Sequence, residues 1–200
     1  MLMLVLNSQI IGKPVQSIHT GSPIASLVHA IVDYRNLQVI AYDVAGPLTR
    51  QENLDVLMTK DIREFIPHGA IVDSIDSLGN SEDIVAVSQI KEVRFDPLNL
   101  RVKTKSGKNI GRVSDLVIDT TDFMIHQIIV RRPVLQSFID PELTISRDLI
   151  IEVTDYDIVI KDDKEKPKAK RKAEKESFIP NYVNPFKQPE FAGETNSTSD

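Results

Sequence analysis

Cysteine is absent from the 200 residues, which excludes disulfides, thiolate metal ligands and a cysteine nucleophile. Tryptophan is absent as well, and the chain has only seven Phe and four Tyr. Because apolar residues still make up 41% of the chain, we predict cores built mainly of Ile, Val and Leu. A chain without cysteine suits a reducing compartment, and we expect a cytoplasmic location.

Long apolar runs are also missing. The apolar start Met1–Leu6 has six residues and lacks the basic flank and small-residue cleavage site of a signal peptide. No later stretch approaches the length of about 18 apolar residues that a membrane helix needs. We therefore expect no transmembrane segment, and residues 3–6 are better interpreted as a first strand.

Charge is divided unevenly along the chain, whose net charge is -5. Residues 1–160 have 15 Lys and Arg against 21 Asp and Glu, whereas residues 161–176 have 8 against 5. The body is thus acidic and the segment that follows it is basic. Such a charged segment buries little apolar surface, which predicts a solvated linker.

An internal repeat organises the body. Residues 21–44 and 107–130 align without a gap at an offset of 86, each with a leading glycine, a strand pattern that ends in aspartate, and a second strand pattern that closes on valine. We predict one domain over residues 1–86, a second over residues 87–162, and a linker with a disordered tail over residues 163–200. Below, the first two segments are called the first repeat and the second repeat.

Short β-branched runs bounded by Gly, Pro, Asn and Asp fill both repeats and predict strands joined by turns. Asp33 and Asp119 open two predicted hairpin turns, where an aspartate can bond its own backbone. The triplets Lys60–Ile62 and Arg147–Leu149 each predict a short helical turn or strand. The predicted strands cover residues 3–6, 14–19, 27–33, 37–44, 70–75, 93–95, 101–104, 112–119, 124–131 and 158–160. The fold class is mainly β, with a barrel or sandwich in each repeat.

The second repeat resembles a known family. Residues 107–119 read GKNIGRVSDLVID, which is similar to the G-x-x-[IL]-G-x-[VI]-x-D-[VL]-V-[VI]-D hairpin of the PRC-barrel domain. This small β-barrel is shared by the photosynthetic reaction-centre H subunit and the C-terminal half of the ribosome-maturation factor RimM. The first repeat is looser, with Ala25 in place of the second glycine and His29 in place of the hairpin aspartate.

The resemblance implies two tandem PRC-type barrels that act as non-catalytic docking modules. The pattern is a fold signature, and fold alone does not carry function. The residues that it assigns to turns and core are Gly12, Gly21, Asp33, Gly107, Gly111, Asp115 and Asp119.

Catalytic and metal-binding patterns have little support. The histidines His19, His29, His68 and His126 lack the short spacings that zinc sites show. No nucleophile elbow or phosphate-binding glycine loop is present. We expect no enzymatic activity, no metal and no cofactor. A small-molecule ligand is not expected either, because small barrels fill their interior with side chains.

A basic strand is the main binding signal of the body. Arg101, Lys103 and Lys105 alternate with Val102 and Thr104, so period two places the three cations on one strand face. Lys108 and Arg112 follow just beyond a turn. A polyanion could bind this face, although solvated charges on the outside of a barrel explain the same pattern, and the acidic body favours that simpler explanation.

The tail provides a second binding signal, because the aromatic residues Phe178, Tyr182 and Phe186 lie among prolines in a polar segment. Such residues are typical of a linear motif that anchors in a partner's groove, although a disordered segment without a binding role explains them equally well. Our first hypothesis is an adaptor that binds protein partners through the tandem barrels and this tail. The alternative is an RNA- or ribosome-associated factor that uses the basic strand and the basic linker.

Overall fold

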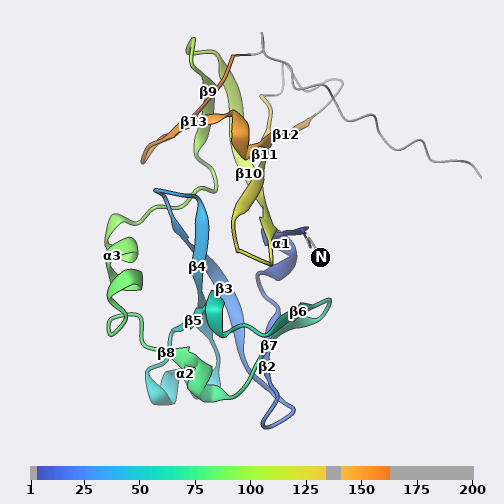
Figure 1. Cartoon of the computed structure of the whole chain (residues 1–200), viewed down its shortest axis with the longest axis vertical. Helices are drawn as coiled ribbons and strands as arrows, with labels where there is room; N and C mark the ends of the chain where they lie inside the picture. Colours follow the sequence, from blue (N-terminus) through green and yellow to red (C-terminus); the bar gives the residue numbers. More distant parts are fainter. Residues whose placement is uncertain (1–3, 134–140, 163–200) are drawn as a thin grey trace, which may run out of the picture. The chain divides into compact units, whose positions relative to one another are not determined.

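The computed structural model describes residues 4–133 and 141–162 (Figure 1). By their contacts, residues 4–133 and 141–162 belong to one compact unit. This unit contains both repeats, so its description follows here. The predicted linker and tail lie outside the described residues.

The first repeat forms a seven-stranded sheet with the order β6-β7-β2-β3-β4-β5-β8. Its centre is the long antiparallel hairpin of β3 and β4, while β2 pairs with β7 in parallel. The strands are β2 (Pro14–Ser17), β3 (Pro23–Asp33), β4 (Gln38–Ala45), β5 (Val56–Met58), β6 (Glu64–Ile66), β7 (Gly69–Val72) and β8 (Leu78–Gly79). Helix α2 (Pro47–Glu52) and the 3-10 turns η1 (Thr59–Asp61) and η2 (Ile75–Ser77) connect them.

The second repeat forms another seven-stranded sheet, with the order β12-β11-β10-β9-β14-β13 and β1 added on β10. Its hairpin β10–β11 is antiparallel, and β9 pairs with β14 in parallel, as β2 does with β7. The strands are β1 (Leu4–Leu6), β9 (Arg101–Thr104), β10 (Asn109–Asp119), β11 (Ile125–Arg131), β12 (Glu142–Ser146), β13 (Ile150–Val153) and β14 (Asp157–Ile160), with η4 (Arg147–Leu149) between β12 and β13. From β2 and β9 onward, the two sheets thus share six strands with the same order and the same pairing senses.

The mainly β prediction is confirmed, and the strand predicted at residues 101–104 is β9 itself. Both basic-acidic-apolar triplets overlap short helical turns, η1 and η4. In a closed barrel, the two end strands of the sheet pair with each other. Among the described residues, no such pairing is found in either sheet.

One predicted strand is wrong. The strand predicted at residues 93–95 overlaps the end of the run Val85–Val93, which folds as helix α3. Arg94 ends this helix in a left-handed conformation with φ 54°. Val87 and Ile90 are buried in a small cluster with residues of the first sheet. This packing outweighs the β preference of the valines. The predicted domain boundary at residue 86 therefore falls inside α3.

Lys91 fixes α3 to the first sheet. Its Nζ lies 2.9 Å from Asp43 Oδ1, 3.3 Å from Asp55 Oδ2 and 3.0 Å from Ser81 Oγ. In the other direction, the N-terminal segment of the first repeat contacts the second sheet. Strand β1 pairs with β10, and Ser8 in helix α1 (Asn7–Ile10) donates two hydrogen bonds to Asp115. Residues assigned to the first repeat thus complete the second sheet.

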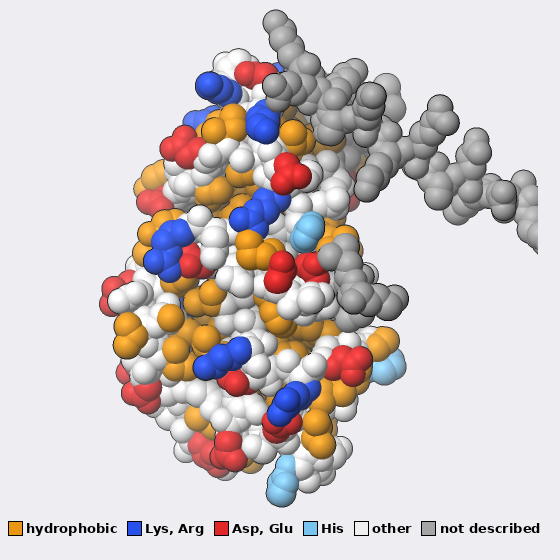
Figure 2. All heavy atoms as spheres, in the orientation of Figure 1, with side chains coloured by type: hydrophobic (Ala, Val, Ile, Leu, Met, Phe, Trp, Pro, Cys, Tyr) orange, Lys and Arg blue, Asp and Glu red, His pale blue; other side chains and the backbone are white. Residues whose placement is uncertain are grey.

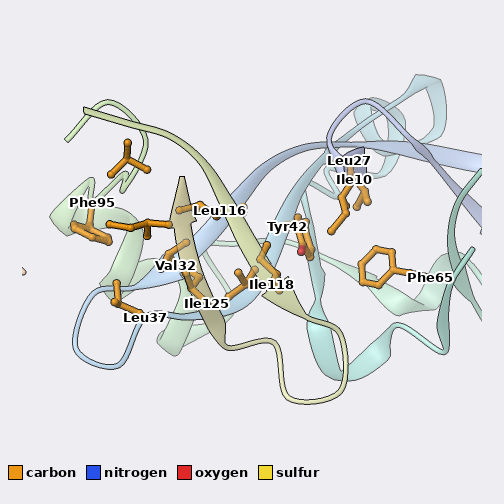
Figure 3. Packing of buried hydrophobic residues seen from close by; sticks show 14 of the residues in the cluster. Ile10, Leu27, Val32, Leu37, Tyr42, Phe65, Phe95, Leu116, Ile118 and Ile125 are labelled. Atoms are coloured by element: carbon orange, nitrogen blue, oxygen red, sulfur yellow. The ribbon is translucent and has the colours of Figure 1, made fainter. Parts of the chain in front are cut away.

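The two hairpin turns meet through reciprocal hydrogen bonds. Val39 N donates to Phe123 O, and Ile125 N donates to Leu37 O, each at 2.9 Å. Val39 and Ile125 occupy equivalent positions of the two repeats, 86 residues apart, and so do Leu37 and Phe123. The two hydrogen bonds are therefore equivalent, as in an interface between two-fold-related copies. A single hydrophobic cluster runs through both repeats, and Figure 3 shows Val32 and Leu37 of one repeat near Leu116 and Ile125 of the other. The repeats therefore share one core.

Candidate functional site

Three arginines stand directly opposite one another on three adjacent strands of the second sheet. Arg112 on β10 is the Cα partner of Arg131 on β11 and of Arg101 on β9. Opposite residues in neighbouring strands project from the same face of a sheet, and all three of these are exposed. We call Arg101, Arg112 and Arg131 the arginine row. The same line of pairing continues to Glu142 on β12 at one end and to Asp157 on β14 at the other.

The fold itself does not require charge in this row. Like charges directly opposite each other destabilise a strand pair, so the pairing of Arg112 with Arg131 is unfavourable for the free protein, whereas Asp157 offsets the charge of Arg101. In the first sheet, the equivalent line of pairing is Pro14, Ser26 and Ala45, with no charge at all. The same strand arrangement is thus built with neutral side chains in one repeat and with arginines in the other.

Gly111 allows the close approach of two backbones beside the arginine row. A β-bulge between Asn109 and Gly111 shifts the pairing of β10 with β9. Gly111 has φ 154°, and a Cβ at this position would lie 2.1 Å from Arg131 O. Only glycine allows β10 to approach β11 this closely, and the bulge brings Arg101 opposite Arg112.

Asp157 neutralises one end of the basic face. Its carboxylate accepts hydrogen bonds from Arg101 Nε at 2.6 Å, Arg101 Nη2 at 3.1 Å and Lys103 Nζ at 2.7 Å. These two cations, Arg101 above all, hold the pKa of the Asp157 carboxyl well below its usual range. Lys103, like Arg101, is thus already paired with a carboxylate of the fold.

The other guanidinium groups are less engaged. Arg112 Nη1 donates to Asn99 O at 2.8 Å. For Arg131 and the adjacent Arg132, the described part of the chain contains no side-chain hydrogen bond or ion pair. A shallow hollow of about 330 Å³ opens here, lined by the arginine row, Arg132, Asn109, Gly111 and Pro133. Figure 2 shows Lys and Arg side chains in the upper part of the view, where β9 lies, with acidic side chains close by.

The structure places the five predicted polyanion-binding residues in different situations. Arg101 and Arg112 belong to the arginine row, and Lys103 binds Asp157. Lys105 and Lys108 lie exposed in the turn between β9 and β10, where the Lys108 amide donates to Thr104 Oγ1. Sequence reasoning missed Arg131 and Arg132, because the partner of a residue across a hairpin depends on register and not on local pattern.

The turn aspartates act within the fold. Asp33 Oδ1 accepts the Arg35 amide at 3.0 Å, and Asp119 Oδ1 accepts the Thr121 amide at 2.9 Å. The Arg35 side chain lowers the pKa of Asp33, and the hydrogen bond from Thr121 lowers the pKa of Asp119. Both carboxylates therefore stabilise the hairpin turns that bring the two repeats together.

The glycines with assigned turn roles have left-handed backbones. Positive φ values are found for Gly12, Gly21 and Gly107.

Across residues 4–133 and 141–162, no three His, Asp or Glu side chains gather in an arrangement that could hold a metal ion. In the same residues, no helix has the length and apolar character needed to cross a membrane. The tail residues Phe178, Tyr182 and Phe186 lie outside the described part of the chain.

A comparison with protein families finds a match over most of the second repeat. The family model of the PRC-barrel domain matches residues 92–167. The second repeat is a PRC-barrel domain. The match leaves the first repeat outside, so the tandem relation of the repeats depends on their alignment and on the strand order that they share. No curated protein matched the chain. The arginine row lies within the matched PRC-barrel segment.

Proposed function

We propose that the chain is a non-catalytic adaptor, in which the outer face of the PRC-barrel domain binds a partner macromolecule through the arginine row. The observation that carries this proposal is the alignment of three guanidinium groups at the positions where the first sheet has Pro14, Ser26 and Ala45. Repulsion within the row is relieved when an anionic partner binds. The first repeat, in this proposal, is a diverged copy that supports the PRC-barrel domain through the shared core.

The first repeat also supplies the variant that tests the proposal. Arg112→Ser combined with Arg131→Ala installs the residues found at the equivalent positions of the first sheet, Ser26 and Ala45. The Arg101–Asp157 contact stays intact. A matched control, Arg50→Ser with Lys60→Ala, removes the same charge from two exposed side chains of the first repeat.

Affinity purification from the native cell, with full-length protein, compares the three forms. We expect the row variant to lose partners that the wild type and the control retain, as quantified by mass spectrometry. If all three forms retain the same partners in the same amounts, the arginine row has no docking role.

The tail is the second predicted contact of the adaptor. Removal of residues 177–200 deletes Phe178, Tyr182 and Phe186 together. We expect this deletion to remove a different subset of partners from the one lost in the row variant, because separate segments would bind separate partners. The same purification measures the effect, and an unchanged partner set after deletion would contradict a role for the tail.

A further inference from the structure

We propose that the arginine row, together with Arg132, receives the carboxylate side chains of an acidic protein segment. This inference rests on the docking function proposed above and names the chemistry of the partner. The hollow beside the row is lined by four arginines together with Asn109, Gly111 and Pro133, so arginine side chains dominate its wall. Two features of the described residues favour a protein carboxylate over a nucleic-acid backbone, and a third shows how the arginines of this chain bind carboxylates.

The first feature is the short length of the row. Neighbouring strands lie about 4.8 Å apart, so three of them span about 10 Å. Glu142 closes one end of the line of pairing, and Asp157 closes the other. A phosphate backbone that continued past the row would meet the exposed Glu142 carboxylate at one end, whereas at the other end Arg101 and Lys103 are already paired with the buried Asp157. A protein segment with two or three acidic side chains fits between the two ends.

The second feature is the charge of the surroundings. Residues 1–86 have ten Asp and Glu against five Lys and Arg, and residues 87–162 have twelve against eleven. Nucleic-acid binding depends on the release of counterions by many cations along an extended surface. The cations of this protein are concentrated locally on an acidic body, which favours a compact anionic group over a long polyanion.

The third feature is the chemistry of arginine. A guanidinium group presents a planar fork that matches the paired oxygens of a carboxylate or of a phosphate, so this feature supports an anionic partner without choosing between the two. This chain already uses that geometry inside its own fold, where Arg101 donates through Nε and Nη2 to the two oxygens of Asp157. Arg35 holds Asp33 in the same way. Arg131 and Arg132 have no such carboxylate among the described residues, so they are the groups that a partner would engage.

Fluorescence anisotropy with defined probes tests the inference on the full chain. The probes are a labelled poly-glutamate peptide and a labelled oligo-uridine RNA of the same length. We expect the peptide to bind and the RNA to bind more weakly, with peptide affinity falling as salt increases. In the Arg112→Ser/Arg131→Ala variant, the peptide affinity should fall about tenfold or more. The Arg50→Ser/Lys60→Ala control should bind like the wild type.

A charge-preserving variant separates carboxylate recognition from general attraction. Arg112→Lys with Arg131→Lys keeps both charges but removes the forks, so we expect an affinity between those of the wild type and the Ser/Ala variant. Thermal melting checks that every variant folds. We expect the Ser/Ala variant to melt no lower than the wild type, because it removes like charges that face each other.

Two results would overturn the inference. Equal peptide affinity in wild type and row variant would show that the row does not bind carboxylates. Tighter, row-dependent binding of the RNA would assign the site to nucleic acid. If the row variant loses cellular partners although the peptide does not bind, the adaptor function stands and the acidic-segment inference fails. If neither partners nor peptide depend on the row, both proposals fail.

Discussion

At the scale of single residues, Tyr42 is the clearest test of core energetics. Its side chain is fully buried, and its hydroxyl has no hydrogen-bond partner among the described residues. Burial raises the pKa of Tyr42, so the phenol stays neutral. The ring packs edge-on against Phe65, with ring centroids 6.1 Å apart. Tyr42 thus contributes an apolar ring and an unpaired polar atom to the same core.

Because an unpaired buried hydroxyl costs free energy, Tyr42→Phe should raise the free energy of unfolding by about 1 kcal/mol. Urea denaturation followed by circular dichroism measures the change. Tyr42→Ala is the contrasting variant, and loss of the ring should cost about 3 to 5 kcal/mol. A Tyr42→Phe protein less stable than the wild type would show that the hydroxyl is bonded in solution.

Asp157 predicts a dependence of stability on pH. Arg101 and Lys103 lower the folded pKa of Asp157 below the ordinary aspartate value of about 3.9, so the ionised carboxylate stabilises the folded state above that value. This contribution is lost as pH falls through the lowered pKa. Asp157→Asn should therefore melt at a lower temperature than the wild type at neutral pH, and the difference should shrink progressively below about pH 4.

Thermal melting of both proteins across this pH range makes the comparison. Asp148→Asn, at an exposed carboxylate in η4, serves as the control and should melt like the wild type at neutral pH. A difference between Asp157→Asn and wild type that stays constant from neutral to strongly acidic pH would show that the ion pairs do not stabilise the fold.

At the scale of elements, the bulge in β10 links the fold to the candidate site. Gly111→Ala places a methyl group against the carbonyl of Arg131, which should cost about 3 kcal/mol or more in unfolding free energy. Gly107→Ala is the matched comparison, because Gly107 has φ 87° but open space around it. It should cost only about 1 kcal/mol. Chemical denaturation of both variants measures the order, and equal costs would contradict the close approach of β10 and β11.

The same bulge explains how far the sequence could predict the site. Alternation of Arg101 and Lys103 correctly predicts β9 and the side that both residues share, since both reach Asp157. Pairing counted from Asn109 and Lys103 without the bulge would place Leu100 opposite Arg112. The bulge shifts the register by one residue and brings Arg101 there instead. The arginine row is therefore a product of non-local register, which local periodicity does not contain.

Prediction of the elements was limited for a related reason. The long hairpins were predicted because their alternation extends over many residues. The short strands β5, β6, β12 and β13, of three to five residues, were not among the predicted strands, although β9, of similar length, was predicted from its alternation. Helix α3 was missed because Val85, Val87 and Val93 favour strands, whereas burial of Val87 and Ile90 against the first sheet decides the conformation.

At the scale of the whole described unit, the reciprocal bonds between hairpin turns and the continuous core predict that the two repeats unfold together. Segments also cross between the repeats, with β1 on the second sheet and Lys91 of α3 bonded to Asp43 of the first. The second sheet thus contains a strand from before residue 86, and the first sheet is packed against a helix whose residues lie mostly after it. Differential scanning calorimetry should therefore show one transition, with a calorimetric enthalpy equal to the van't Hoff enthalpy.

A pair of core variants tests this coupling from both sides. Leu27→Ala lies in the first sheet and Ile118→Ala in the second, and both side chains are fully buried in the shared cluster. Each should lower the free energy of unfolding by about 2 to 5 kcal/mol and shift the single transition as a whole. Hydrogen exchange should then show faster opening in both sheets for either variant, because a shared core transmits the loss. Two resolved transitions, of which each variant shifts only one, would establish that the repeats are independent domains joined by a passive contact.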